Sequence, residues 1–177
     1  MTMFSIRLRI LGTMGAALSV LLLAGGADAA PKHKTVDATA LKAAAASPLS
    51  AEALEALYAG RTWKWKDGGG FFSADRHRFI AWSQKGRAWS YGQGRWYATN
   101  RGKLCLQAYW RNKMSDGGDT TCFLHRQKDG VIYQKRSLGG DWYVFRHRAL
   151  RSTDEAAKLI RGDLVSKGFE RIKAKAR

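Results

Sequence analysis

Alternation between apolar and polar residues dominates the middle of the chain and predicts a β-sheet. Between Arg61 and His147 the sequence divides into short alternating segments, among them RTWKW, KLCLQAYW and VIYQKR. In KLCLQAYW the face that carries Leu104 and Trp110 is apolar, whereas Gln107 lies on the opposite face. Because successive side chains of a strand point to opposite faces, each segment is expected to turn its apolar side towards a core.

Turn-forming residues separate about eight such segments and define the fold class. The predicted turns contain Gly68–Gly70, Lys85-Gly86, Gly92–Gly94, Asn100–Gly102, Asp116–Asp119, Lys128–Gly130 and Gly139-Gly140. We therefore predict a mainly β protein, an antiparallel meander of about eight strands that closes into a small lipocalin-like barrel. Closure removes the exposed edge strands that an open meander would leave for aggregation.

A short helix is predicted before the strands. Ser47 and Pro48 offer an N-cap and a proline at the first helical position. Leu54 and Tyr58 fall on one helical face, and Gly60 stands where the helix would end. This amphipathic helix is expected to plug or flank the sheet.

A second helix is predicted after the strands. Residues 152–155 (STDE) have the form of a capping box, with Ser152 as the cap and Glu155 reaching back. An apolar stripe continues to Leu164, and Gly168 is a plausible stop. We expect this helix to dock on the barrel rather than to lie on an anionic membrane. Residues 167–177 (KGFERIKAKAR) are expected to be a frayed, solvated basic tail.

The N-terminus has the pattern of a secretory signal peptide. A basic start with Arg7 and Arg9 precedes an apolar run, and Ala27-Asp28-Ala29 supplies a cleavage site. The run is shorter than the ~20 residues of a transmembrane span, which disfavours an anchor. The predicted organisation is therefore a signal peptide (1–29, cut after Ala29), an Ala-rich linker (30–48), a helix plus barrel domain (49–148) and a basic C-terminal helix and tail (149–177). The protein would be periplasmic or secreted.

The two cysteines, Cys105 and Cys122, occupy the two arms of a predicted hairpin. In an exported protein a lone pair of cysteines is most often a disulfide. A zinc site built from both cysteines and His125 is the alternative, but structural zinc sites use compact cysteine pairs and four ligands. We predict a disulfide that clamps the hairpin.

The charge of the chain points to anionic partners. Lys and Arg number 31 against 14 Asp and Glu, which gives a formal net charge of +17. An excess of this size attracts polyanions. Since export makes nucleic acid unexpected, the expected partners are an anionic envelope polysaccharide, a lipid headgroup or an exported protein, with no transmembrane anchor after processing. A basic surface that is merely solvated is the alternative.

Arginines and aromatic residues are interleaved along the strands, as in surfaces that stack planar groups and pair anions. The candidate ligand-binding residues are Trp63, Trp65, Arg87, Trp89, Arg95, Trp96, Trp110, Arg111 and Trp142. Most of the tryptophans are also expected to serve packing, because indoles supply much core area in a small domain.

The sequence lacks the usual signatures of catalysis. It contains no Gly-x-Ser-x-Gly elbow, no phosphate-binding glycine loop and no His-Glu-x-x-His. His77, His125 and His147 could together bind zinc, but neighbouring arginines disfavour a further cation. We assign no catalytic residue, metal or cofactor. An enzyme that uses His125 with Asp119 or Asp141 as acid and base is kept as an alternative.

Four segments in order resemble an exported, mostly alphaproteobacterial family known as domain of unknown function 995. They are LEALYAGRTWKWKDGGGFF, GRWYATNRGKLCLQAYW, CFLHR and VIYQKRSLGGDWYVF, and they span Leu54 to Phe145. The shared motifs are Leu-Tyr-x-Gly-x-x-Trp-x-Trp, Gly-x-x-Cys, Cys-Phe-x-His and Gly-x-Trp-Tyr-x-Phe. The resemblance implies an exported β domain with paired cysteines, and it implies no catalytic role.

These observations favour a non-enzymatic envelope protein that binds an anionic or amphiphilic component. Two alternatives belong to other classes: an interaction or inhibitor module that docks on another exported protein, and a His-dependent envelope hydrolase. A module would present a broad exposed apolar patch. A hydrolase would bring its acid and base within hydrogen-bond reach in a pocket.

Overall fold

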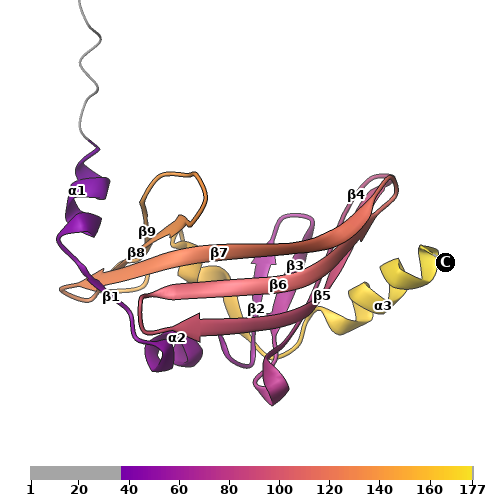
Figure 1. The fold of residues 1–177 in the computed structure, drawn as a ribbon, viewed down its shortest axis with the longest axis horizontal. Helices are drawn as coiled ribbons and strands as arrows, with labels where there is room; N and C mark the ends of the chain where they lie inside the picture. The colour runs from indigo at the N-terminus through magenta and orange to yellow at the C-terminus, as the bar shows by residue number, and fades with distance from the viewer. Residues whose placement is uncertain (1–36, 177) are drawn as a thin grey trace, which may run out of the picture. The chain divides into compact units, whose positions relative to one another are not determined.

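Ten strands and three α-helices make up residues 37–176, the part of the chain that the computed structural model describes (Figure 1). The predicted signal peptide lies outside these residues. The helices are α1 (Ala38–Ala44), α2 (Ala51–Tyr58) and α3 (Ser166–Lys175), with 3-10 helices η1 (Asp75–His77) and η2 (Glu155–Lys158). The strands are β1 (Ser47–Pro48), β2 (Arg61–Trp65), β3 (Gly68–Phe72), β4 (Arg78–Lys85), β5 (Ala88–Thr99), β6 (Lys103–Asn112), β7 (Asp116–Lys128), β8 (Val131–Arg136), β9 (Tyr143–Arg146) and β10 (Leu159–Arg161).

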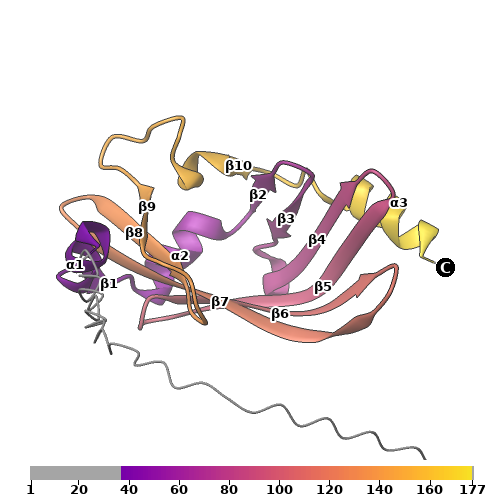
Figure 2. The same cartoon turned by 90° about the horizontal axis from the view of Figure 1, so that it is seen from above.

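The strands form one antiparallel sheet that curls into a half-barrel (Figure 2). Strands β2 to β9 follow one another as a meander, β10 pairs with β2, and β1 pairs with β7. This confirms the predicted class, a mainly β meander of barrel-like form. The hydrogen-bonded order ends at β9 and β10, and η2 packs against both β9 and β2. Packing therefore covers the seam between the two ends of the sheet.

Glycine-rich stretches that were expected to be turns lie inside strands. Strands β3, β5 and β7 include residues 68–70, 92–94 and 116–119. At Gly92 an added Cβ would come within 2.6 Å of the Trp110 indole on the next strand. Glycine at this position thus makes room for an aromatic ring, and the turn prediction there was wrong.

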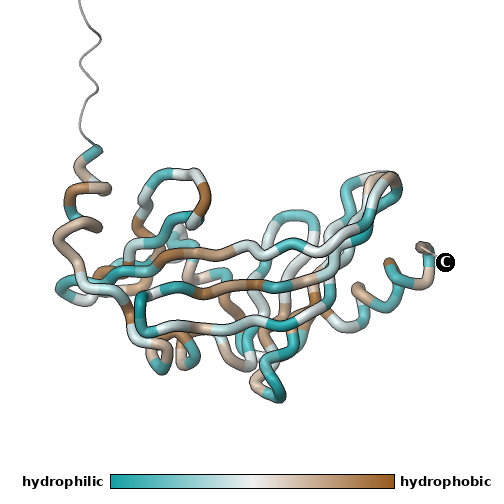
Figure 3. The backbone as a smooth tube through the Cα atoms, in the orientation of Figure 1, coloured by the Kyte–Doolittle hydropathy of each residue, from teal (hydrophilic) through white to brown (hydrophobic). Residues whose placement is uncertain are grey.

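Alternation did identify the core face of the strands. Leu104, Leu106 and Ala108 are buried, whereas Gln107 and Tyr109 are exposed. Figure 3 shows hydrophobic and hydrophilic positions mixed along the strands, as expected for a sheet with one face on a core. The largest fully buried side chains include Trp96, Tyr58, Phe72, Phe79 and Phe145. The interior is therefore filled by aromatic rings, and α2 contributes to it through Leu54 and Tyr58.

The segment that was assigned to a linker is partly structured. Helix α1 begins after Asp37, whose carboxylate accepts a hydrogen bond from Thr39 N at 2.8 Å. It ends against Arg126, which donates to the carbonyl oxygens of Ala43 and Ala44 at 3.2 and 3.1 Å. The next helix, α2, is capped by Ser50 rather than by the predicted Ser47.

The C-terminal region also differs from the prediction. The segment expected to be a helix forms η2 and β10, and the helix α3 lies instead in the residues expected to fray. Phe169 and Ile172 are buried against the outer side of the sheet, where Trp82 and Tyr91 contact them. Gly168, the predicted stop, lies within α3. This helix therefore docks through an apolar face that the basic composition of the segment obscured.

Cys105 and Cys122 form the predicted disulfide. The two residues are direct partners in the register of β6 and β7, with Cα atoms 4.0 Å apart. The bond clamps the centre of the sheet. Within residues 37–176 no helix has the length and apolarity needed to span a membrane.

Candidate ligand-binding pocket

A buried polar cluster joins α2 to strands β7, β8 and β9. The hydroxyl of Tyr58 lies 2.9 Å from Nε2 of His125. The side-chain amide of Gln134 donates to Tyr58 Oη at 2.9 Å and lies 2.6 Å from His125 Nε2. Tyr143 donates its hydroxyl hydrogen to Gln134 Oε1. Three of these residues, Tyr58, His125 and Tyr143, come from the motifs that carry the family resemblance, so the motifs converge in the core.

The cluster is neutral near pH 7. Burial lowers the pKa of His125 to about 4, and backbone groups of Gly102 and Phe123 only partly oppose this shift. Burial likewise raises the pKa of both Tyr58 and Tyr143. A buried polar network that is hydrogen-bonded in this way specifies the packing of a core. We therefore interpret the cluster as structural.

The acid–base hypothesis required His125 to meet Asp119 or Asp141. In the described structure the partners of its Nε2 atom are Tyr58 and Gln134 instead. Asp119 lies exposed on β7, where it accepts a hydrogen bond from Thr121. The proposed catalytic pair is thus not assembled, and the hydrolase hypothesis loses its support.

The three histidines considered for zinc have separate environments. His77 lies 3.3 Å from a carboxylate oxygen of Glu55, and His147 lies 2.6 Å from that of Asp154. His125 is buried in the polar cluster. Each therefore has a structural partner of its own.

A pocket of about 450 Å³ opens where α2 faces η2 across the ends of β2, β8 and β9. This volume lies within the range of small-molecule sites, roughly 300–1,000 Å³. Its apolar lining consists of Leu49, Ala53, Ala56, Leu57, Ile132, Leu150, Ala156, Ala157 and Leu159. Its polar lining consists of Arg61, Gln127 and Arg146.

Two cations give the pocket its electrostatic character. Arg61 and Arg146 line it, and none of the lining residues is acidic. Within residues 37–176 neither arginine lies in a salt bridge. Apolar walls exclude part of the water that would otherwise screen an anion from these guanidinium groups, which strengthens the attraction. The arrangement suits a molecule with an anionic head and an apolar body.

Hydrogen bonds to η2 fix one wall of the pocket. The indole of Trp63 on β2 donates to Oε1 of Glu155 at 2.8 Å. Lys158 donates to the other carboxylate oxygen at 2.6 Å. These bonds hold η2, and with it Ala156, beside β2. The carboxylate of Glu155 therefore positions η2 by accepting hydrogen bonds from Trp63 and Lys158, and it is not used in the predicted capping box.

Asp154 fixes the turn that carries Leu150 into the pocket. Asp154 is 2% exposed, and its carboxylate accepts hydrogen bonds from the backbone N atoms of His147 and Arg151, at 2.9 and 3.0 Å. The ring of His147 adds a contact at 2.6 Å. Burial opposes ionisation of Asp154, but these hydrogen bonds outweigh it and lower the pKa to about 2. The carboxylate is therefore charged at any ordinary pH and orders the turn.

The predicted ligand tryptophans occupy several separate places. Trp63, Trp96 and Trp110 pack in or against the core, and the indole N–H of Trp96 donates to Ser73 O at 2.9 Å. Trp89 stacks on Tyr91 in the cluster that α3 covers. Packing thus accounts for most of the indoles.

Two of the predicted tryptophans remain at the surface or close to it. Trp65 is 36% exposed at the end of β2. Trp142 lies under the cationic groups of Arg126 and Lys135, which are 5.6 and 5.5 Å from its ring centroid. The ring of Trp142 therefore already contacts two cationic side chains of the protein itself. Trp65 borders a second pocket.

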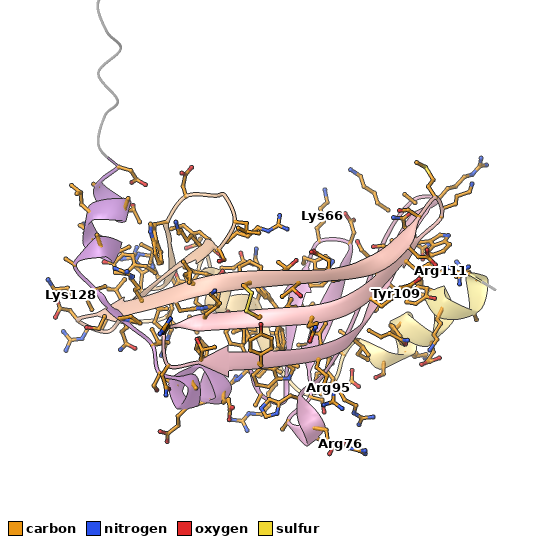
Figure 4. The ribbon with its side chains drawn as sticks, viewed as in Figure 1. Lys66, Arg76, Arg95, Tyr109, Arg111 and Lys128 are labelled. Carbon is orange, nitrogen blue, oxygen red and sulfur yellow. A yellow bond between two sulfur atoms is a disulfide. The ribbon has the colours of Figure 1, made fainter. Side chains whose placement is uncertain are left out.

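The predicted arginines Arg87, Arg95 and Arg111 are exposed, and none of them lines the pocket. Arg95 and Arg111 are labelled in Figure 4. The pocket arginines Arg61 and Arg146 were not among the candidates. Arg61 lies two residues before the inward-facing Trp63, so alternation could have placed it on the inner side. The sequence offers no comparable signal for Arg146, because the pocket wall beside it comes from η2.

The fold and the pocket define a small barrel-like β protein with a cationic, apolar-walled pocket. The chain belongs to the family described as proteins of unknown function (DUF995), whose family model matches residues 20–165. This confirms the resemblance seen in the sequence. Searches of curated proteins and of solved structures found no match.

Proposed function

We propose that this protein is an exported, non-enzymatic binding protein of the cell envelope and that its pocket takes an anionic amphiphile. The pocket carries the proposal, because Arg61 and Arg146 line it among apolar side chains and none of its lining residues is acidic. An arginine pair of this kind matches the two oxygens of a carboxylate or phosphate head. The surrounding leucines and alanines would cover the adjoining methylene groups.

Export is supported by the sequence of the first 29 residues and by the disulfide. Disulfides persist in oxidising compartments such as the periplasm. The formal net charge of +17 would add to the attraction of anionic envelope components. Cleavage after Ala29 can be tested by N-terminal sequencing of the mature protein.

Binding can be tested by calorimetry with three probes that share a twelve-carbon chain: laurate, dodecyl maltoside and dodecyltrimethylammonium. Laurate is expected to bind best and to bind more weakly as salt is added. The double substitution Arg61→Gln/Arg146→Gln should weaken laurate binding about tenfold, since each exposed ion pair contributes up to about 1 kcal/mol. Arg95→Gln/Arg101→Gln removes the same charge outside the pocket and should leave laurate binding nearly unchanged. Equal affinity for all three probes, or equal loss in both double variants, would refute the assignment.

A protein-interaction module has weaker support. The aromatic filling of the interior suits such a module, which would need a broad apolar patch. The large exposed apolar side chains instead come from separate segments, among them Leu41 in α1, Met114 in the β6–β7 turn, Leu138 before β9 and Leu164 before α3. The pocket is therefore the more specific feature.

A further inference from the structure

A shallow hollow of about 440 Å³ lies on the outer side of the sheet, across β5, β6 and β7. It shares no lining residue with the amphiphile pocket. In Figure 1 this side of the three strands faces the viewer, and no helix covers it. The outward-facing residues of its lining are Gln93, Gln107, Tyr109, Gly118 and Thr120.

The strand register places these residues on one face of the sheet. Tyr109 of β6 pairs with Gln93 on β5 and with Gly118 on β7. Residues paired in this way turn their side chains to the same face. Tyr91, two residues before Gln93, contacts α3 on the outer side of the sheet. Since positions two apart in a strand share a face, the hollow lies on that outer side.

Gly118 keeps the space beside Tyr109 open. An added Cβ at Gly118 would meet no atom within 4 Å. Tyr109, labelled in Figure 4, is 48% exposed. A hydrogen bond from its hydroxyl to the Asp116 side chain raises the pKa of Tyr109. Because Asp116 belongs to β7, the ring reaches across from β6 to β7 and forms one wall of the hollow.

Three side chains around this ring can both donate and accept hydrogen bonds. Gln93 and Gln107 carry amides, and Thr120 carries a hydroxyl. Lys173 of α3 donates to Oε1 of Gln93 at 3.1 Å, which orients that amide and leaves its N–H groups as donors. An anion accepts hydrogen bonds only, whereas each hydroxyl of a sugar donates and accepts. The lining therefore suits a ligand that is rich in hydroxyl groups.

Charge does not select an anion here. No lysine or arginine lines the hollow, although the chain has a formal net charge of +17. Arg95 lies on the same face in the next row, opposite Gln107. On the other side of the hollow Arg111 pairs with Asp116, so that its charge is offset. The surroundings of the hollow are thus closer to neutral than the rest of the surface.

A second exposed ring extends this surface along the strands. Tyr97 is 43% exposed and lies opposite Cys105, on the same face as Tyr109. Cys105 and Tyr109 are four residues apart, which corresponds to roughly 14 Å along a strand at about 3.4 Å per residue. The negative face of an aromatic ring packs well on the C–H groups of a sugar ring. Two such rings in line suit a straight, flat chain of sugars, whereas a protein partner would need an apolar interface core.

We infer that this hollow binds a neutral oligosaccharide, with one sugar packed on Tyr109 and a further sugar on Tyr97. The amides of Gln93 and Gln107 and the hydroxyl of Thr120 bond the hydroxyl groups of the first sugar. This inference does not depend on the amphiphile pocket, because the two sites share no residue. The protein would hold a glycan chain on its outer side and a small anionic ligand in its pocket.

Calorimetry on the mature protein tests the site with two neutral hexasaccharides, cellohexaose and chitohexaose, and with oligogalacturonate as the acidic comparison. At least one neutral hexasaccharide should bind more tightly than oligogalacturonate. Its affinity should not change between low and high salt, since the ligand carries no charge to be screened. Tighter binding of oligogalacturonate, or no binding of either neutral probe, would overturn the inference.

Two adjacent glycines supply a matched pair of variants. Gly118→Val fills the hollow and should weaken binding of the neutral probe at least tenfold. Gly117→Val adds the same side chain on the opposite face of β7, where an added Cβ likewise meets no atom within 4 Å, and should leave binding unchanged. Both variants are expected to fold because the space is open, and circular dichroism checks this. Equal losses in the two variants would refute the assignment to the outer face.

Tyr109 allows an independent measurement. Tyr109→Ala should weaken binding about fivefold, the scale of one aromatic contact, whereas Tyr109→Phe retains the ring and should keep most of the affinity. Unchanged binding in Tyr109→Ala would exclude the ring from the site and overturn the inference. Laurate binding should persist in Gly118→Val and in Tyr109→Ala, so a failure of the sugar site is distinct from a failure of the amphiphile pocket.

Discussion

The buried His125 should make the protein sensitive to mild acid, and the substitution His125→Gln should remove that sensitivity. In the folded protein the imidazole is fully buried against Tyr58 and Gln134, and its pKa is about 4 instead of 6.5. The folded state therefore binds the proton more weakly than the unfolded state does. The stabilisation that depends on neutral His125 is fully present above pH 6.5 and is lost as the pH falls towards 4.

The magnitude follows from the two pKa values. Their difference, at 1.36 kcal/mol per pH unit, corresponds to a total loss of about 3 kcal/mol in the free energy of unfolding. About 2 kcal/mol of it would already be lost at pH 5, where the unfolded chain is almost fully protonated at this site and the folded protein is not. Such a loss is a large part of the stability of a small domain.

Urea unfolding at pH 7.5, 6 and 5, followed by tryptophan fluorescence, measures this loss. Gln at position 125 can still hydrogen-bond to Tyr58 but does not titrate. Between pH 7.5 and pH 5 the variant should therefore lose about 2 kcal/mol less of its free energy of unfolding than the original protein does. Parallel pH profiles for His125→Gln and the original protein would show that the reasoning is wrong.

Three further predictions concern other parts of the structure. Cys105→Ala/Cys122→Ala should lower the free energy of unfolding by about 3 kcal/mol, the chain-entropy estimate for a closed loop of 17 residues, and reduction of the original protein should do the same in urea titrations. Asp154→Asn should lower the melting temperature at pH 7, and because the pKa of Asp154 is about 2, the original protein should lose this advantage only as the pH falls below 3.8. Gly168→Ala should loosen α3 and speed its cleavage by trypsin, because the new Cβ would overlap the indole packed there; Gly117→Ala, with open space around it, is the control. A melting curve unchanged by Asp154→Asn, or trypsin cleavage unchanged by Gly168→Ala, would contradict the contacts described for each.

Local alternation was a reliable guide where one strand packs on one core. The burial of Leu104, Leu106 and Ala108 followed directly from the side-chain period of a strand. Gly92 was predicted to lie in a turn but lies inside a strand. Glycine is needed there because the Trp110 ring on the neighbouring strand occupies the space that a side chain would take. A residue type chosen by a neighbour across the sheet cannot be distinguished from a turn residue until the strands are placed.

The same limit applies to the C-terminal helix. Phe169 and Ile172 are three residues apart, which is helical spacing, but two apolar residues in a basic segment do not show whether a partner surface exists. The outer side of the sheet supplies that surface through Trp82 and Tyr91. The helix is therefore a consequence of tertiary packing rather than of local propensity.

The first pocket shows most clearly what only the folded chain could reveal. Arg61 could be assigned to the inner face from its spacing to Trp63, but its partner Arg146 belongs to the last strand of the meander. The wall beside them is held by the bond between Trp63 and Glu155, two residues far apart in the sequence. A site assembled from both ends of a domain leaves no compact motif, so aromatic and arginine neighbours within single strands did not point to this pocket. The buried cluster around His125 is the converse case: its residues stand in recognisable motifs because they specify the core that holds both ends together.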